Sequence, residues 1–322
     1  MKKNQPPKRG QLSDGFRKNL TSGKQSDILK YILSDPDLDI QLRDNYINVY
    51  YKGGNILRMG PQSFQFDKFY FYRRKDGSKP FPKSYVENMA KGKSNKISEN
   101  TKEPIPSVDE AQKIIASLDT KTEALKSLLS TDIKGYFLMA KATMNEWFND
   151  WDKSERNDQH TIALNNRNFE NGSDLVVLDI EFAVSRNLPY NHAYNNKGDK
   201  KVCRFDIIAV DCRGQLYVIE LKQNEEADSK DNKANVKVHT RDFDATVGGN
   251  DAQSFVDEIA GLVETKKNLG ILNKSVFVDK KEKPLFAVAY SGQEADAFNE
   301  KYRKAGLKVI KVEGEKKLLK LK

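Results

Sequence analysis

The amino-acid sequence predicts an α/β protein, in which helices pack on a mixed β-sheet that follows a small, separate β-rich module. From about residue 154 onward, amphipathic stretches alternate with short apolar runs in the order αβββαβαβ, which is typical of a sheet covered by helices. Before that, residues 39–74 alternate apolar and polar residues and are dense in Tyr, Phe and Ile, as antiparallel strands are. The chain of 322 residues is long enough for both parts.

The N-terminal part of the chain is expected to hold an arm and the β-rich module. Residues 1–24 are polar, basic and rich in Gly, Pro and Ser, which predicts a disordered arm. The module and its linker cover residues 25–106 and begin with a short helix from Ser26. A Gly-Gly pair at 53–54, between two alternating runs, predicts a β-hairpin. The module ends in a basic, aromatic edge at residues 70–74.

A linker and a helical segment separate this module from the rest of the chain. Residues 75–107 are interrupted by Gly, Pro, Ser and Lys and are predicted to be loop. Ser107, followed three residues later by Glu110, has the pattern of a capping box and predicts the start of a helix. Helical spacing continues over the whole segment 107–150.

The C-terminal domain, residues 151–322, is predicted to contain the mixed sheet. Its expected elements are a helix at 154–169, strands at 175–186, 201–211 and 215–223, a helix at 251–269, a strand at 284–292, a helix at 293–306 and one or two edge strands at 307–322. Residues 224–250 are polar and aperiodic, and an excursion of this length usually has a function or is mobile.

Two of these strands form a hairpin that brings charged residues together. A three-residue loop, Cys212-Arg213-Gly214, with glycine in the left-handed conformation, fixes the register of the pairing. Counting outward from this loop, Asp206 lies directly opposite Glu220. Because side chains alternate along a strand, Lys222 lies on the same face as Glu220.

The pairing of Asp206 with Glu220 points to a metal site, because carboxylates held this close repel each other unless a proton or a cation lies between them. A hard divalent cation with oxygen ligands is the natural partner, and Mg²⁺ keeps several waters for chemistry. Lys222 is placed to orient a metal-bound water or to neutralise charge on a phosphate. The alternative is an ordinary surface salt bridge between Lys222 and one of the two acids.

Asp206 and the Glu220-Leu221-Lys222 triplet on paired strands resemble the motif of the PD-(D/E)xK nuclease superfamily, also called restriction-endonuclease-like. The αβββαβ order also resembles the core of that family, over about residues 150–310, although Phe205 stands where the nominal motif has proline. The resemblance implies a restriction-endonuclease-like fold and a nuclease that depends on Mg²⁺ or Mn²⁺. Asp206 and Glu220 would bind the metal together with the Leu221 carbonyl, and Lys222 would support the nucleophile.

Two further acids are candidates for the same site. Members resembling the Holliday-junction-resolvase branch of the family carry an acid on the first helix, and Glu155, with Gln159 one turn on, occupies that place. In the strand before the hairpin, Glu181 is expected on the polar face with Asp179, opposite an apolar face that includes Leu178 and Ile180. Either Glu155 or Glu181 could complete the metal shell, and for each the alternative is a solvated charge.

Composition favours an acidic partner. The formal net charge is +9, which suggests nucleic acid, and the family resemblance makes DNA the expected substrate. Two cysteines and three scattered histidines offer no disulfide framework or zinc ribbon. No apolar run is long enough to cross a bilayer and no secretory signal is present, so we expect a cytoplasmic protein without a membrane partner. A homodimer or a partner protein is left open.

The expected function is hydrolysis of phosphodiester bonds by a metal-activated water, in restriction, phage defence, repair or transposition. The main alternative is a non-catalytic nucleic-acid-binding protein on the same fold. The presence of Asp206, Glu220 and Lys222 together argues against it, since a degenerate site would be expected to lose one of them. A structural or partner-binding protein, in which the basic charge is incidental, is the second alternative.

Overall fold

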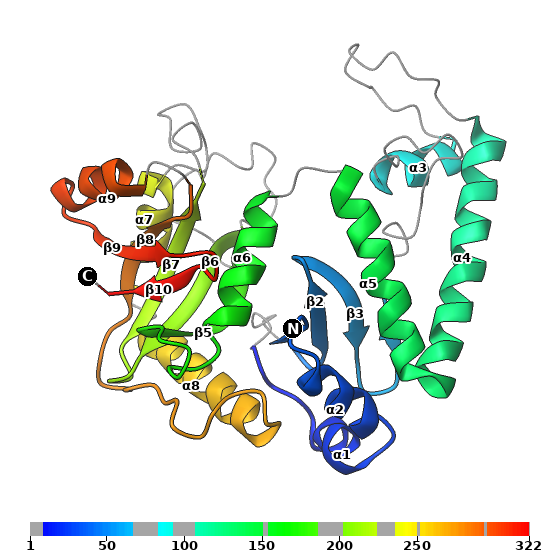
Figure 1. Ribbon diagram of the computed structural model, residues 1–322, viewed down its shortest axis with the longest axis horizontal. Coiled ribbons are helices and arrows are strands. Elements are labelled where there is room, and N and C mark those ends of the chain that lie inside the picture. Colours follow the sequence, from blue (N-terminus) through cyan, green and yellow to red (C-terminus); the bar gives the residue numbers. More distant parts are fainter. Residues whose placement is uncertain are drawn as a thin grey trace, which may run out of the picture.

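Two β-sheets organise the molecule, and helices pack against both of them (Figure 1). The computed structural model describes residues 9–66, 83–92, 107–150, 154–185, 202–223, 236–249, 252–292 and 295–321. The first sheet is formed by the N-terminal part of the chain and the second by the C-terminal part, which confirms a mixed α/β protein with a β-rich N-terminal module.

The N-terminal sheet is antiparallel and has the strand order β1-β2-β3-β4. Its strands are β1 (Asp39–Leu42), β2 (Ile47–Tyr51), β3 (Gly54–Met59) and β4 (Phe64–Gln65). The chain turns from β2 into β3 at Lys52 and Gly53, so the predicted hairpin is confirmed. The predicted basic, aromatic edge at residues 70–74 lies outside the described residues.

Two short helices precede this sheet, α1 (Asp14–Ser22) and α2 (Ser26–Ser34). α2 begins where predicted, but α1 lies inside the arm that the sequence predicts to be disordered. The backbone N–H of Phe16 donates to the Ser13 hydroxyl at the start of α1, and Phe16 and Leu20 are buried. This apolar face orders the helix, so the prediction of disorder is wrong for residues 9–24. Residues 1–8 lie outside the described part of the chain.

The helical segment consists of α4 (Val108–Thr131) and α5 (Ile133–Asp150), and α3 (Lys83–Ala90) comes before it. The predicted capping box starts α4: the Glu110 N–H donates to Ser107 Oγ over 3.2 Å, and the Ser107 N–H donates to Glu110 Oε2 over 2.8 Å. α3 corrects the prediction that the whole linker is loop. It forms there because Val86 is buried in a small apolar cluster with Leu118 of α4.

The C-terminal sheet is mixed and has the strand order β10-β9-β8-β7-β6-β5. Its strands are β5 (Leu175–Ser185), β6 (Val202–Asp211), β7 (Leu216–Lys222), β8 (Leu285–Tyr290), β9 (Lys308–Glu313) and β10 (Leu318–Lys320). The first three strands pair antiparallel, β7, β8 and β9 run parallel, and β10 returns antiparallel to β9. Each strand predicted for this domain is therefore present.

Helices cover both faces of this sheet: α6 (Ser154–Asn165), α7 (Val236–Ala245), α8 (Ala252–Asn268) and α9 (Ala295–Lys304). α6 packs Ile162 on one face, and α8 packs Phe255 on the other. α7 lies within the stretch that the sequence predicts to be aperiodic, where Val236 and Phe243 enter the core. Among the described helices, none is long and apolar enough to span a membrane.

One apolar cluster joins the two sheets. It contains Val49 of β2 and Phe137 of α5 together with Val176 of β5 and Leu262 of α8. The antiparallel sheet is separate from the mixed sheet, as predicted. Apolar residues of both parts nevertheless belong to one cluster.

Candidate active site

The hairpin of β6 and β7 has the register that the sequence predicts. Ile207 pairs with Ile219, and the pairing continues in step to the loop, where Gly214 has a φ of +85°. The next position outward places Asp206 opposite Glu220, where β6 enters the ladder and β7 leaves it. The tight turn therefore sets the positions of both acids along their strands.

The charged groups at this end are buried because they continue an apolar face of the sheet. Ile208 and Val218 pack in the larger apolar cluster, whereas Ile207 packs in the smaller cluster on the opposite face. Glu220 and Lys222 continue the row of Val218 and are only 2% and 5% exposed. With so little water around them, these charges must be balanced by one another or by a bound ligand.

The two carboxylate oxygens of Glu220 differ in their surroundings. Lys222 Nζ donates to Glu220 Oε1 over 2.6 Å, and His239 Nε2 lies 3.2 Å from the same oxygen. Glu220 Oε2 is buried and has no hydrogen-bond partner among the described residues. A buried carboxylate oxygen left in this way is placed to accept a cation.

His239 is a site residue that the sequence analysis missed. It lies on α7, where Val236, His239 and Phe243 are all buried, at the i, i+3 and i+7 positions of one helix face. This spacing is hard to recognise in the sequence, because polar residues lie between the three positions and the surrounding stretch has no helical period. The spacing was the signal that could have placed the histidine on an inward-facing helix.

Asp206 is half-buried, and its carboxylate is held by a backbone amide. Its Oδ2 accepts a hydrogen bond of 2.9 Å from the Leu221 N–H. The side chain of Gln159 on α6 donates to the Asp206 carbonyl over 2.6 Å, which ties this helix to the start of β6. The structure thus places the Leu221 amide at the site, while a metal contact of the Leu221 carbonyl stays a prediction.

Negative charge exceeds positive charge at this end of the hairpin. Burial raises the pKa of Asp206 to about 6, and Glu155 and Glu181 raise it further, against the opposing effects of Lys222 and the Leu221 N–H. Burial, and then repulsion from Asp206, hold the pKa of Glu220 well above its usual range. Burial opposes the charge of Lys222, but the carboxylates outweigh it and raise the Lys222 pKa. An excess of this sign attracts a cation.

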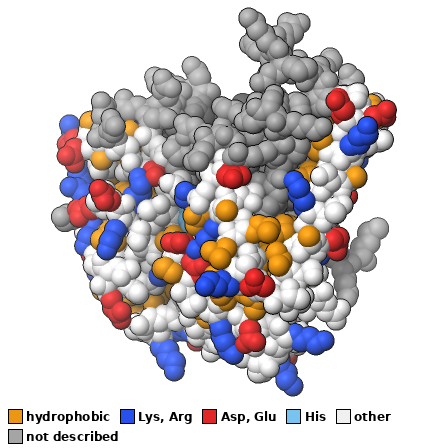
Figure 2. Space-filling model, turned by 45° about the vertical axis from the view of Figure 1, so that its right-hand side comes forward, with side chains coloured by type: hydrophobic (Ala, Val, Ile, Leu, Met, Phe, Trp, Pro, Cys, Tyr) orange, Lys and Arg blue, Asp and Glu red, His pale blue; other side chains and the backbone are white. Residues whose placement is uncertain are grey.

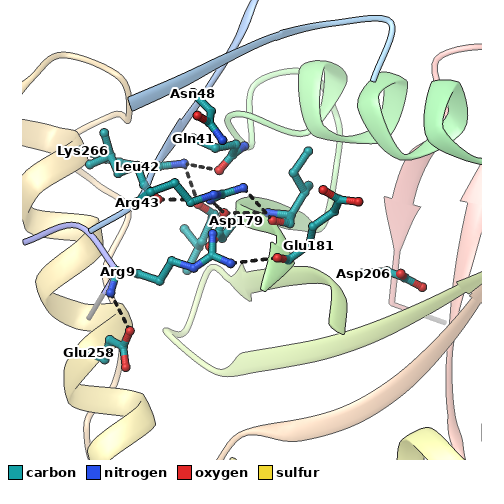
Figure 3. A network of polar contacts seen from close by, with 12 residues as sticks. Arg9, Gln41, Leu42, Arg43, Asn48, Asp179, Glu181, Asp206, Glu258 and Lys266 are labelled. Carbon is teal, nitrogen blue, oxygen red and sulfur yellow. Dashed lines mark hydrogen bonds and ion pairs between the residues drawn. The ribbon is translucent and has the colours of Figure 1, made fainter. Parts of the chain in front are cut away.

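Glu181 of β5 lies in the same row as the two acids of the hairpin. The ladder between β5 and β6 pairs the residues on either side of Glu181 with those on either side of Asp206, so these acids face each other. Figure 3 shows both residues on their neighbouring strands. Three acids therefore form one row across β5, β6 and β7: Glu181, Asp206 and Glu220.

β5 is irregular where it carries Glu181. Its register against β6 shifts between Val177 and Asp179, and Glu181 has a φ of +50°, which is unusual for a residue other than glycine. As a result Leu178 packs in the larger apolar cluster and Ile180 in the smaller one. The prediction that both lie on one face is wrong, because a bulge and a left-handed residue move the side chains between faces.

Glu155 lies in the first turn of α6 and is exposed. It is close enough to raise the pKa of Asp206, Glu220 and Lys222. Both Glu155 and Glu181 are therefore close enough to the hairpin to interact electrostatically with Asp206, and either could complete the metal site.

The carboxylates of the row are turned to different partners. Glu220 faces Lys222 and Asp206 faces an amide of β7, while the Glu181 carboxylate lies 3.6 Å from Arg204. Accordingly, no three His, Cys, Asp or Glu side chains in the described part of the chain converge as a ready-made metal site. No protein-family model, curated protein or solved structure matches the chain.

The raised pKa of Asp206 has a measurable consequence for stability. The folded protein holds this proton more tightly than the unfolded chain, so the free energy of unfolding should fall as pH rises from near 3.8 to about 6. In Asp206→Asn this part of the pH dependence should disappear. Urea unfolding of both proteins across this pH range, in EDTA, measures the difference. Parallel profiles for the two proteins would show that Asp206 has an ordinary pKa.

Proposed function

We propose that this chain is a metal-dependent nuclease that hydrolyses phosphodiester bonds at Asp206, Glu220 and Lys222. The observation that carries the proposal is the buried end of the β6–β7 hairpin. There, two acids lie on facing strands beside a buried lysine, and Glu220 Oε2 has no hydrogen-bond partner among the described residues. A structural salt bridge needs one acid and one base, and it explains neither the second acid nor the unpaired oxygen.

The residues present fit a hard divalent cation. The available donors are carboxylate oxygens, which Mg²⁺ and Mn²⁺ prefer. The unpaired Glu220 Oε2 and the raised pKa of Asp206 both indicate a site that gains stability when a cation arrives. Asp206 and Glu220 would hold the ion, and it would supply Lewis-acid chemistry and a more acidic bound water.

The order of elements also supports the proposal. α6, β5, β6, β7, α8 and β8 follow one another in the αβββαβ order that the PD-(D/E)xK resemblance implies, with α7 added between β7 and α8. α6 lies on one face of the sheet and α8 on the other. A fold of this kind does not establish an activity, so the site residues carry the functional argument.

Lys222 would supply a fixed positive charge to the reaction. Its ammonium is buried and stays charged beside Glu220, which raises its pKa. A fixed positive charge in a site with little water stabilises the charge that builds on a phosphate during hydrolysis. The same ammonium can orient the attacking water, since it has three donors and Glu220 Oε1 takes one of them.

DNA is the proposed substrate, and the basic charge of the chain is the reason to expect salt-sensitive binding. On the face shown in Figure 2, lysine and arginine side chains are mixed with acidic ones and do not gather into one patch. Binding should weaken as the salt concentration rises. A homodimer or a partner protein would be compatible with such an enzyme.

A non-catalytic nucleic-acid-binding protein is the second candidate function. It is favoured by one observation, namely that no three potential ligand side chains converge among the described residues. It predicts DNA binding that does not depend on Mg²⁺ and no cleavage under any condition.

Cleavage of plasmid and linear DNA with Mg²⁺ or Mn²⁺, compared with EDTA, tests the proposal. We expect cleavage that needs the metal and is lost in Glu220→Gln, a change that keeps the shape of the side chain. Asp211→Asn is the matched control, because Asp211 is a buried acid at the loop end of the same hairpin. Cleavage that persists in Glu220→Gln would remove this site from the reaction. DNA binding without cleavage would favour the non-catalytic candidate.

Glu155→Gln and Glu181→Gln should separate the two remaining acids. The variant that lacks the acid completing the metal site should cleave DNA roughly 10- to 100-fold more slowly. The other variant should cleave at a rate near that of wild type, because only one of the two acids contacts the ion. Glutamine keeps the size of each side chain and, at position 181, the same backbone strain. Cleavage rates across a Mn²⁺ titration measure the effect, and equal small losses in both variants would leave Asp206 and Glu220 as the proposed ligands.

A further inference from the structure

Four consecutive residues of β5, 178–181, are held by cations that come from outside the sheet (Figure 3). The three cations come from three distant segments: Arg9 before α1, Arg43 after β1, and Lys266 on α8. Each is buried or nearly so. This stretch includes the bulge of β5 and ends at Glu181, beside Asp206.

The cations donate hydrogen bonds to backbone carbonyls of β5, which is the edge strand of the sheet and has a neighbouring strand on one side only. Lys266 Nζ donates to the Leu178 carbonyl over 2.6 Å, and Arg43 Nη2 donates to the Ile180 carbonyl over 3.1 Å. Buried carbonyl groups need such donors, because an unsatisfied polar group in the core is costly. The irregular backbone of β5 is therefore held by the N-terminal part of the chain and by α8.

Arg9 is the cation that reaches Glu181 itself. Its Nη2 donates to the Glu181 carbonyl over 2.8 Å, and its Nη1 lies 3.0 Å from Asp179 Oδ2. Glu181 has the left-handed backbone in this strand, and such a conformation persists only where neighbouring groups enforce it. Arg9 thus binds the carbonyl of the left-handed residue and the carboxylate of Asp179, two residues before it.

The segment around Arg9 packs against α8. The Arg9 N–H donates to Glu258 Oε1 over 2.7 Å, and the Thr265 hydroxyl donates to the Gly10 carbonyl over 3.2 Å. Gly10 has a φ of +75°, and a Cβ added there would lie 3.0 Å from the Cα of Leu262. Residue 10 must therefore be glycine for Arg9 to reach β5 in this way.

The cluster contains more positive than negative charge, so Arg9 is not needed to neutralise Asp179. Arg43 Nη1 contacts Asp179 Oδ1 over 2.6 Å and remains when Arg9 is removed. Burial lowers the pKa of Arg9, attraction to Asp179 opposes this shift, and repulsion from Arg43 adds to it. Loss of Arg9 should therefore free the Glu181 peptide without leaving a buried charge unpaired.

We infer that Arg9 is a positioning residue of the active site, which holds the Glu181 peptide of β5 and thereby places Glu181 beside Asp206. For its effect on catalysis, the inference rests on the proposed function and takes Glu181 as the acid that completes the metal site. The structural part of the inference, that Arg9 holds the backbone of β5, is tested by a measurement that does not require DNA cleavage. Arg9 is nearly buried, so it acts through Glu181 and not by contact with DNA.

The test uses full-length wild type, Arg9→Ala, Arg9→Lys and Arg17→Ala. Arg17 is the matched control, because it lies in the same N-terminal segment and forms an exposed ion pair with Asp14. At saturating DNA and Mg²⁺, we expect the single-turnover rate of Arg9→Ala to fall about 10- to 100-fold, with DNA affinity unchanged. Arg9→Lys should recover part of the rate, since one ammonium replaces only part of the guanidinium's contacts. Arg17→Ala should cleave as wild type does.

Amide hydrogen exchange supplies the readout that does not depend on cleavage. Peptides covering β5 should exchange faster in Arg9→Ala than in wild type and Arg17→Ala, and Gly10→Ala should behave like Arg9→Ala because it displaces the same segment. Unchanged exchange in Arg9→Ala would overturn the inference, whether or not the wild type cleaves DNA. Faster exchange with wild-type cleavage would overturn the role in positioning. A wild type that never cleaves would instead overturn the proposed function.

Discussion

Asp206→Asn should abolish Mg²⁺-dependent DNA cleavage and at the same time stabilise the protein in EDTA. Cleavage should fall by about 10²- to 10³-fold or more, because a metal ligand is lost. The free energy of unfolding at alkaline pH should rise by on the order of 1 to 3 kcal/mol. The reason is that burial raises the pKa of Asp206 to about 6, so keeping it charged at higher pH opposes folding.

Urea unfolding and plasmid cleavage on the same preparations check this result. The matched control is again Asp211→Asn, whose carboxylate accepts hydrogen bonds from loop N–H groups and lies at the far end of the hairpin. The control should keep cleavage and lose a little stability. If Asp206→Asn instead lost stability and kept cleavage, the acid would be part of a structural ion pair.

Lys222→Ala should also lose cleavage, but its stability should move in the opposite direction. Lys222 Nζ lies 2.6 Å from Glu220 Oε1 in a buried pair. Removing one member of such a pair leaves an uncompensated charge and costs about 3–5 kcal/mol. Metal binding should be largely retained, and Mn²⁺ should raise the melting temperature of this variant more than that of wild type, because the ion supplies the missing positive charge.

A double variant, Lys222→Ala with Glu220→Gln, separates stability from catalysis. It removes both charges, so most of the lost stability should return while cleavage stays absent. Lys30→Ala is the control for loss of a lysine, since Lys30 forms an exposed pair with Asp27 that should be worth about 0–1 kcal/mol. A Lys222→Ala protein that cleaves DNA at the wild-type rate would exclude the catalytic role of the lysine.

The features that the sequence determined by itself are those that depend on near neighbours. The three-residue loop ending at Gly214 sets the register of the β6–β7 hairpin, so the facing positions of Asp206 and Glu220 followed from counting residues. The capping box of Ser107 and Glu110 likewise placed the start of α4. In each case the interacting residues are only a few positions apart, so a short stretch of sequence is enough to predict the interaction.

The tertiary structure decided the features that depend on distant partners. α1 is ordered because Phe16 and Leu20 are buried in a core shared with the C-terminal domain, although its composition resembles that of a disordered arm. His239 reaches Glu220 because the mostly polar helix α7 packs on the sheet. Composition and local periodicity do not predict contacts between residues that are far apart in the sequence.

The position of Glu181 depends on the tertiary structure most of all. A regular strand would have kept its neighbours on one face, as the alternation in the sequence predicts. Arg9 and Arg43, far away in the chain, bind the backbone of this irregular segment and the carboxylate of Asp179. β5 is the edge strand of its sheet, so the backbone groups that face away from β6 find their partners only in distant parts of the chain.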